Sequence, residues 1–310
     1  MSPHVLAADI GGTKLAAALV AEDGTVVRRK EVPTPAAPPG AASVVGDALA
    51  GLLHEVAGDA PPAAVSVASA GPLDPVAGTV SPVNIPAWRD YPILARVAEV
   101  VPGVPRRLVG DAVAAAAGEH WRGAGQGRDG MLGIVVSTGI GGGLVLGGLP
   151  FTGPTGNAGH IGHIVVDPGG ALCPCGATGC VETVASGPSM VRWARENGWS
   201  GADARGLSAA ASTGDPVALA AFARGMDALA RGIVSVAAIC DLDQVVVGGG
   251  VAAAGDTLFA PLRRAVAEHT HLPYVRRLRV DPATLGRDAG LVGAARMALL
   301  PSIPPANGAP

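Results

Sequence analysis

One histidine and three cysteines form the most distinctive chemical group in this sequence. His163, Cys173, Cys175 and Cys180 lie within one short segment that is also rich in glycine. Three thiolates and one imidazole are a common tetrahedral ligand set for zinc, and the glycines allow the loop to fold back so that the ligands converge. The spacing therefore predicts a structural zinc site. The alternatives are a disulfide or cysteines that only pack.

The rest of the sequence argues against oxidised cysteines. No charged segment followed by an apolar stretch precedes the first predicted strand, and no apolar run reaches the roughly 18 residues that a membrane-spanning helix needs. We therefore expect a cytoplasmic protein with no membrane partner, where disulfides are rare. Cys240 stands alone in an apolar run and is predicted to be a core residue.

Two glycine-rich segments have the composition of phosphate-binding turns. Asp9-Ile-Gly-Gly-Thr-Lys14 follows a short apolar run, and Thr138-Gly-Ile-Gly-Gly-Gly143 follows another. Bare glycine backbone can present N–H groups to phosphate oxygens, and Asp9 at a strand end can hold a magnesium ion through water. A plain hairpin turn capped by Asp9 is the alternative. The second segment lacks the final glycine and the following helix of a dinucleotide-binding fingerprint.

Hydrophobic patterning and turn residues predict a layered α/β protein with parallel pairing. The first part reads as a hairpin over 5–20, strands at 26–32, 64–68 and 107–109, and helices at 42–57, 92–100 and 112–121. The second part reads as a hairpin of 131–137 with 143–148, strands at 244–247 and 278–280, and helices at 188–197, 215–239, 256–268 and 288–299. The repeated strand, glycine turn and strand indicate two related domains that present glycine turns to one phosphate chain.

We place the domains at 1–110, completed by the helix at 288–299, and at 111–287, with a disordered tail over 301–310. The chain has 310 residues, which favours two domains over one. Its formal net charge of -3 and its two lysines, Lys14 and Lys30, give no basic footprint for nucleic acid.

The motifs together resemble the ROK family of sugar kinases and sugar-sensing repressors, which has the actin-like ATPase (ribonuclease H-like) fold. The resemblance rests on residues 9–14, 138–143, 173–182 and Val247-Gly-Gly-Gly250, and it spans residues 5 to about 298. It implies a kinase that uses Mg-ATP and a structural zinc, and a homodimer or homotetramer. The ATP contacts implied are Asp9, Gly11, Gly12, Thr13, Lys14, Thr138, Gly139, Gly141, Gly249 and Gly250.

The same resemblance implies a sugar site. Asp111, which follows a predicted strand, would be the base that accepts the proton of the sugar's primary hydroxyl, although an Asp at a helix start is often only an N-cap. Glu182 would bind near the anomeric end, and His163 would both bind zinc and touch the sugar. Gly71 and Asn84 match a backbone contact and a loop that lies over the sugar.

Two departures from the family pattern bear on the substrate. The chain has Gly110-Asp111 where the family has Asn-Asp, and His160-Ile-Gly-His163 where it has Glu-x-Gly-His. In glucose-binding members those two side chains contact hydroxyls around C3, so glucose would leave hydrogen-bonding groups unpaired at about 1–3 kcal/mol each. We therefore expect a hexose altered near C3, such as kanosamine, or a C7-cyclitol, with His160 and Gly110 at the altered position.

Other readings stay open. His160 could be drift in an exposed loop or an auxiliary metal ligand, and ordinary glucose, mannose or an N-acetylhexosamine is the second choice of substrate. A sugar-sensing repressor of the same family would carry a helix-turn-helix domain ahead of Asp9, for which we expect no room.

Overall fold

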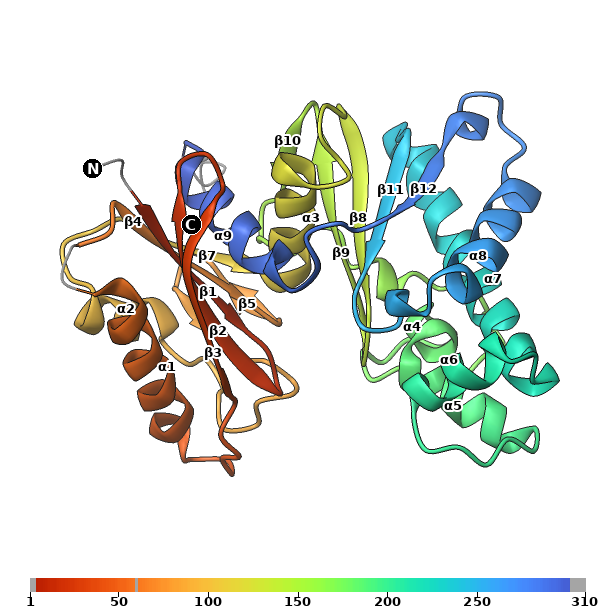
Figure 1. Cartoon of the computed structure of the whole chain (residues 1–310), viewed down its shortest axis with the longest axis horizontal. Coiled ribbons are helices and arrows are strands. Elements are labelled where there is room, and N and C mark those ends of the chain that lie inside the picture. The colour runs from red at the N-terminus through yellow and green to blue at the C-terminus, as the bar shows by residue number, and fades with distance from the viewer. Residues whose placement is uncertain (1–3, 59–60, 302–310) are drawn as a thin grey trace. The chain divides into compact units, whose positions relative to one another are not determined.

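The computed structural model describes residues 4–58 and 61–301 and divides the chain into two compact units. The first unit comprises residues 1–126, 150–158 and 287–310, and the second comprises 127–149 and 159–286. Each unit contains one five-stranded sheet, and helices flank each sheet (Figure 1). The chain therefore leaves the first unit and returns to it with its last helix.

The sheet of the first unit has the strand order β3-β2-β1-β4-β7. The strand β1 pairs antiparallel with β2 and parallel with β4, and β4 pairs parallel with β7. Parallel strands with helical crossovers end at the same edge of a sheet, so their following loops gather there. The strands are β1 (His4–Ile10), β2 (Lys14–Ala21), β3 (Val26–Pro33), β4 (Ala64–Ser69) and β7 (Arg106–Gly110), with a separate two-stranded ribbon of β5 (Leu73–Asp74) and β6 (Thr79–Val80).

The central strands β1 and β4 are covered on both faces, which explains why they read as continuous apolar runs. Leu6, Ala8 and Ile10 of β1 belong to the cluster that includes α1 (Ala42–Ala57) and α2 (Ile93–Val100). Val5 and Ala7 point to the opposite face, where α3 (Asp111–Arg122) and α9 (Ala289–Leu299) pack.

Glycines allow α3 and α9 to approach closely. A Cβ added at Gly293 would lie 1.6 Å from the carbonyl oxygen of Ala114, and one added at Gly118 would lie 2.3 Å from that of Ala289. These distances are far below van der Waals contact, so only glycine fits at either position. Because α3 packs against α9 in this way, the first unit extends through Gln126, whereas the sequence suggested a boundary after Gly110.

The second unit has the strand order β10-β9-β8-β11-β12, with β12 at an edge. The strands β8 and β9 form an antiparallel hairpin, and β11 pairs parallel with β8 and with β12. Its strands are β8 (Gly130–Val136), β9 (Ile140–Leu146), β10 (Leu149–Phe151), β11 (Gln244–Gly248) and β12 (Arg279–Pro282).

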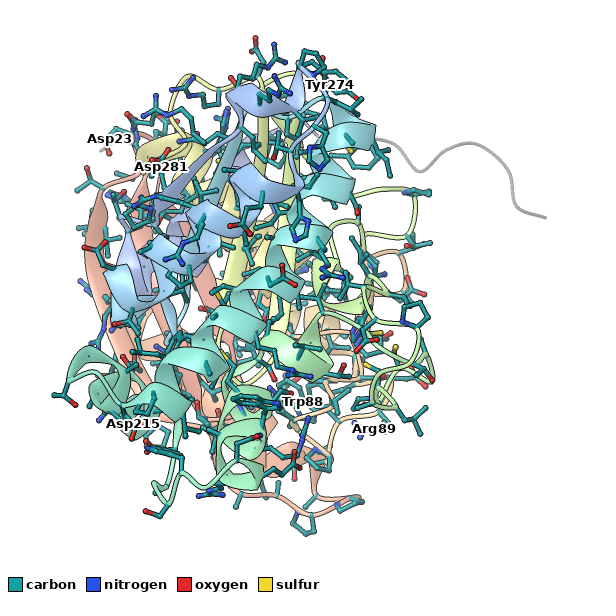
Figure 2. The ribbon with its side chains drawn as sticks, turned by 90° about the vertical axis from the view of Figure 1, so that its right-hand side faces the viewer. Asp23, Trp88, Arg89, Asp215, Tyr274 and Asp281 are labelled. Atoms are coloured by element: carbon teal, nitrogen blue, oxygen red, sulfur yellow. The ribbon has the colours of Figure 1, made fainter. Side chains whose placement is uncertain are left out.

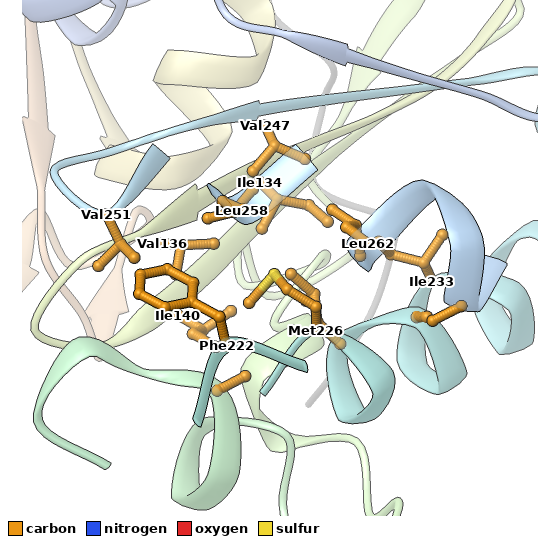
Figure 3. Packing of buried hydrophobic residues seen from close by; sticks show 14 of the residues in the cluster. Ile134, Val136, Ile140, Phe222, Met226, Ile233, Val247, Val251, Leu258 and Leu262 are labelled. Atoms are coloured by element: carbon orange, nitrogen blue, oxygen red, sulfur yellow. The ribbon is translucent and has the colours of Figure 1, made fainter. Parts of the chain in front are cut away.

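The core of the second unit forms between its sheet and its longest helix. The helices are α4 (Glu182–Ala185), α5 (Gly187–Glu196), α6 (Ala204–Ser212), α7 (Pro216–Cys240) and α8 (Asp256–His269). The helix α7 begins at an N-cap, Asp215 (labelled in Figure 2), whose carboxylate accepts a hydrogen bond from the amide of Ala218. Phe222 and Met226 of α7 pack against Ile134 of β8 and Leu258 of α8 (Figure 3).

Most predicted elements are confirmed, and two kinds of error stand out. The strand predicted at 143–148 is β9 and begins at Ile140, because glycines pair in a ladder without needing side chains. The helices α4 and α6 were not predicted, nor were β5, β6 and β10, all of which are short. The tail prediction falls almost wholly on residues 302–310, which lie outside the described residues. In the described part of the chain, every helix is too short or too polar to cross a membrane.

Candidate functional site

The carboxyl ends of three parallel strands bring two acidic residues to one edge of the first sheet. Ile10, Ser69 and Gly110, at the ends of β1, β4 and β7, lie in one row of the strand register. Asp9 precedes this row by one residue, and Asp111 follows it as the first residue of α3. Asp111 is exposed, and its Oδ1 accepts a hydrogen bond from the amide of Ala112 at 2.7 Å. The structure thus brings Asp9 and Asp111 into the same unit and the same sheet edge.

Burial changes the acidity of Asp9. Desolvation, followed by the negative charge of Asp111, raises the pKa of Asp9 to about 6, against the opposing effect of Lys14 and Arg29. A nearby cation would stabilise the ionised form of this carboxylate.

A glycine of α9 makes room for the Asp9 carboxylate. A Cβ added at Gly290 would lie 2.6 Å from Oδ2 of Asp9. Sequence analysis assigned no role to Gly290. A glycine at a helix start was the only available signal, and that signal is not specific.

The first glycine turn is closed by its own backbone. The amide of Gly11 donates to the carbonyl of Lys14 at 3.0 Å, and the hydroxyl of Thr34 donates to the carbonyl of Gly11 at 2.7 Å. The ammonium of Lys14 lies 3.4 Å from Oε2 of Glu31, and Thr13 is exposed. The amide of Gly11 is therefore committed to the turn and not directed outward.

Asn84 packs directly on this turn. A Cβ at Gly12 would lie 2.7 Å from Cβ, Cγ and Nδ2 of Asn84, so the turn needs glycine there to admit the asparagine. Sequence analysis assigned Gly12 to ATP and Asn84 to the sugar, and the structure places them in contact. Gly71 lies in the loop between β4 and β5.

The second glycine segment is part turn and part strand. The turn consists of Ser137, Thr138 and Gly139, and the amide of Ser137 donates to the carbonyl of Gly139 at 2.9 Å. Gly141 lies in β9 and pairs with Val135. The interpretation of residues 139–143 as one phosphate loop is thus wrong in its second half.

The carboxylate of Glu182 fixes this turn. Its Oε2 accepts a hydrogen bond from the amide of Ile140 at 2.7 Å, and a Cβ at Gly139 would lie 2.7 Å from the same oxygen. Glu182 is only half-buried and begins α4, two residues after Cys180. The structure therefore connects the cysteine segment to the glycine turn through one side chain, which sequence analysis had assigned to the sugar.

The predicted metal ligands converge. One ligand atom from each of His163, Cys173, Cys175 and Cys180 lies within 4.8 Å of every other. The Sγ atoms of Cys175 and Cys180 are 3.7 Å apart, and Nδ1 of His163 is 3.6 Å from Sγ of Cys173. A tetrahedral zinc with bonds of about 2.3 Å to sulfur would separate two sulfurs by about 3.8 Å. All four cysteines of the chain, including Cys240 outside the cluster, are free thiols. The donor set of three cysteines and one histidine fits a zinc ion.

His160 lies beside this cluster but is not part of it. Its ring centroid is 6.2 Å from that of His163, with the two ring planes 14° apart. The residue is exposed and precedes the short 3-10 turn Ile161–His163. The structure therefore offers no support for an auxiliary metal-ligand role, because the ligand set closes with His163.

A cavity of about 900 Å³ opens in the second unit. Ser137 and Thr138 of the glycine turn line it, together with Gly250 and Val251 after β11, and two of these residues, Thr138 and Gly250, are among the ATP contacts that the family resemblance implies. Gly249 has φ +91°, and its backbone passes so close to Val136 that a Cβ would lie 2.4 Å from the Val136 carbonyl oxygen. Only glycine accepts this conformation and this approach.

Sequence analysis missed most of the cavity wall. Gly187 and Pro188, at the start of α5, line it, as do Arg192, Arg195 and the Ala202–Arg205 segment. A helix N-terminus favours anions, so this wall suits a phosphate-bearing ligand. These residues follow no motif, which is why the sequence did not reveal them.

Comparisons with known proteins identify similar proteins along nearly the whole chain. Residues 5–300 match the sequence model of a family described as "ROK family". The chain is 41% identical over 294 residues to an N-acetylmannosamine kinase of Shigella boydii serotype 18, covering 94% of this chain and 97% of that protein. It is 35% identical over 307 residues to a glucokinase of Thermotoga maritima, covering 94% and 96%.

A solved structure shares the fold. The crystal structure of a ROK family glucokinase from Streptomyces griseus, in complex with glucose and AMPPNP, matches with a TM-score of 0.82 and 35% identity, covering 95% of this chain and 99% of that one.

Proposed function

The chain belongs to the ROK family and is an ATP-dependent sugar kinase, and from that premise we propose which residues carry the reaction and which sugar accepts the phosphate. The observation that carries the proposal is the pair of carboxylates, Asp9 and Asp111, at one sheet edge.

Asp111 is the base in this proposal. Phosphoryl transfer needs mainly positioning and charge neutralisation, so a carboxylate of ordinary basicity can accept the proton of a primary hydroxyl as it attacks the γ-phosphate. The exposure of Asp111 leaves it accessible to a substrate. Its Oδ1 accepts a hydrogen bond from the adjacent amide, that of Ala112, and the N-cap position of α3 belongs to Gly110.

Asp9 has the complementary role of holding magnesium through water. Magnesium bridges phosphate oxygens and neutralises the charge that develops in transfer. The burial that raises the pKa of Asp9 also makes its ionised form dependent on a nearby cation. Gly11, Gly12, Thr13 and Lys14 would lie along the phosphates.

The cavity of the second unit would hold the nucleotide. Thr138 and Gly139 would face its phosphates, with Gly141 behind them in β9, and Gly249 and Gly250 would leave room for the purine. Two features support this assignment, namely the turn held by Glu182 and the start of α5 on the same wall.

Zinc would occupy the Cys3His cluster and act on structure. It would hold the 163–182 segment so that His163 and Glu182 keep their places, and it would take no part in the chemistry. Direct contacts of His163, Glu182, Gly71 and Asn84 with the sugar remain predictions of the family resemblance.

For the substrate we favour N-acetylmannosamine. The relative of that activity is 41% identical to this chain, and the glucokinase is 35% identical. An acetamido group has an N–H donor and a carbonyl acceptor. An imidazole at position 160 can donate a hydrogen bond to the acetyl oxygen or accept one from the N–H, whereas an ionised carboxylate can only accept. Gly110 in place of an asparagine favours the second candidate, a hexose altered at C3 such as kanosamine, or a C7-cyclitol.

A substrate panel tests the proposal. The protein and Mg-ATP are presented with N-acetylmannosamine, N-acetylglucosamine, glucose, mannose, kanosamine and a C7-cyclitol, and kcat/KM is compared. We expect N-acetylmannosamine to exceed glucose by at least about tenfold, since one retuned polar contact contributes roughly 1.4 kcal/mol. His160→Glu should move preference back toward glucose.

The controls separate the substrate from the reaction. Asp111→Asn should lower kcat by about 10²-fold or more for every sugar, while leaving binding of AMPPNP unchanged. If glucose is the best substrate of the wild type, the substrate assignment is wrong and the kinase assignment stands. Near-native turnover by Asp111→Asn would remove Asp111 from the mechanism.

A further inference from the structure

A second cavity lies in the same unit and shares no lining residue with the nucleotide cavity. It measures about 600 Å³ and is enclosed by the second half of α8, the short turn Val275–Arg277 and the edge strand β12. Small-molecule sites fall in this size range.

Its rim is strongly positive for a protein whose formal net charge is -3. Three arginines line it, Arg263, Arg276 and Arg279, against one acidic residue, Asp281 (labelled in Figure 2). The carboxylate is already engaged: its Oδ2 accepts from Nε2 of Gln244 at 2.9 Å and lies 3.8 Å from Nε of Arg279. The overall charge gave no sign of this cluster.

Arg263 is held in place before any ligand arrives. Its Nε donates to the carbonyl of Val280 at 2.9 Å, and its guanidinium carbon lies 5.3 Å from the ring centroid of Phe259. With Nε engaged, Nη1 and Nη2 form the remaining edge, the geometry that suits two phosphate oxygens. A fixed side chain loses less entropy on binding than a mobile one.

The floor of the cavity is apolar, made by Val266, Val275, Leu278 and Val280. A ligand that satisfies both parts has an anionic group for the rim and a small organic body for the floor. A simpler reading is that Arg263 only protects the sheet edge, since its Nε occupies a carbonyl of β12 that has no further strand beside it. That reading does not explain why Arg276, which lies on a different element, lines the same cavity.

We infer that this cavity binds a small phosphomonoester, with Arg263 and Arg276 on the phosphate and the apolar floor under its organic part. The helix α8 begins at Asp256, next to the wall residues Ala253 and Ala254 of the nucleotide cavity, and carries Arg263 further along. One helix therefore contributes to the second cavity and starts beside the first.

Titration calorimetry on the full chain tests the inference. Inorganic phosphate and glycerol 3-phosphate serve as probes, and saturating ADP fills the nucleotide cavity. The wild type should bind one equivalent of each, with glycerol 3-phosphate the tighter because of the apolar floor. Arg263→Gln with Arg276→Gln should weaken both by at least about tenfold, since charge-assisted hydrogen bonds are lost.

Arg277→Gln is the matched control. Arg277 follows Arg276 directly but lies outside the cavity, where its Nη2 is 2.9 Å from Oδ1 of Asp241. This variant should bind both probes like the wild type. Glutamine at 263 can still donate to Val280, so an unchanged melting temperature and ADP affinity will show that the double variant is folded. Equal affinity in the double variant and the wild type, or no saturable binding of either probe, overturns the inference.

Discussion

At the scale of single residues, Asp9 carries a conflict between stability and function. Its pKa is about 6 in the folded protein, against a usual 3.8, because burial and the charge of Asp111 disfavour the ionised form. The folded state therefore binds more protons than the unfolded state between these values. Stability falls as pH rises through that window, and the penalty at neutral pH is about 3 kcal/mol.

We expect Asp9→Asn to remove this penalty. Without magnesium, the variant should be more stable than the wild type at pH 7.5 and should lose most of the pH dependence between about pH 4 and 6. Its phosphotransfer should fall if Asp9 holds magnesium as proposed. Denaturant unfolding across pH measures the difference, and a variant less stable than the wild type at pH 7.5 would contradict the assignment of this pKa.

At the scale of elements, α9 makes room for the Asp9 carboxylate by lacking a side chain at Gly290. Gly290→Ala would place a Cβ only 2.6 Å from Oδ2 of Asp9, and should cost about 1–3 kcal/mol in unfolding free energy together with a loss of turnover. The matched control is Gly51→Ala in α1, where a Cβ meets nothing within 4 Å. That change should stabilise the protein by up to about 1 kcal/mol. Equal effects at the two positions would show that α9 does not shape the Asp9 environment.

The contact between α4 and the glycine turn gives a second prediction at this scale. Glu182→Ala removes the acceptor of the Ile140 amide, so the turn loosens and the Kd of AMPPNP should rise by about threefold to tenfold, in addition to any change in the KM of the sugar. Glu182→Gln keeps an acceptor oxygen and should retain nucleotide affinity. If both variants bind AMPPNP like the wild type, Glu182 acts on the sugar alone.

At the scale of the whole molecule, each unit has its own core. The cluster around α7 belongs to the second unit, and the two clusters on either face of the first sheet belong to the first. The metal ligands all lie in the second unit. A lesion at the metal site should therefore be felt mainly there.

We expect one zinc per chain by elemental analysis, and Cys175→Ser to lose it. Hydrogen exchange should then accelerate in β8, β9 and α7 and change little in β1 and α1, because only the second core depends on the ligand segment. Cys240→Ser is the control, since Cys240 lies at the end of α7 outside the cluster. Active wild-type protein without zinc would refute the metal assignment.

The sequence by itself determined the features that depend only on residues close together in the chain. Four candidate metal ligands within one glycine-rich loop predicted the cluster that the structure contains, and glycines such as Gly249, with φ +91°, mark turns that other residues rarely adopt. Apolar runs of strand and helix length placed most elements within a few residues. The family motifs then gave the reaction.

Only the tertiary structure decided how distant segments meet. Gly290 lies far along the chain from Asp9, and no local pattern shows that its missing Cβ admits a carboxylate. In the sequence Glu182 only follows Cys180 by two residues. In the structure its carboxylate accepts a hydrogen bond from the amide of Ile140, next to the glycine turn. The three arginines of the second cavity come from α8, a short turn and β12, and a formal net charge of -3 does not reveal that they lie together. Charge, packing and hydrogen bonding act through space, so these features depend on the folded arrangement and not on spacing along the chain.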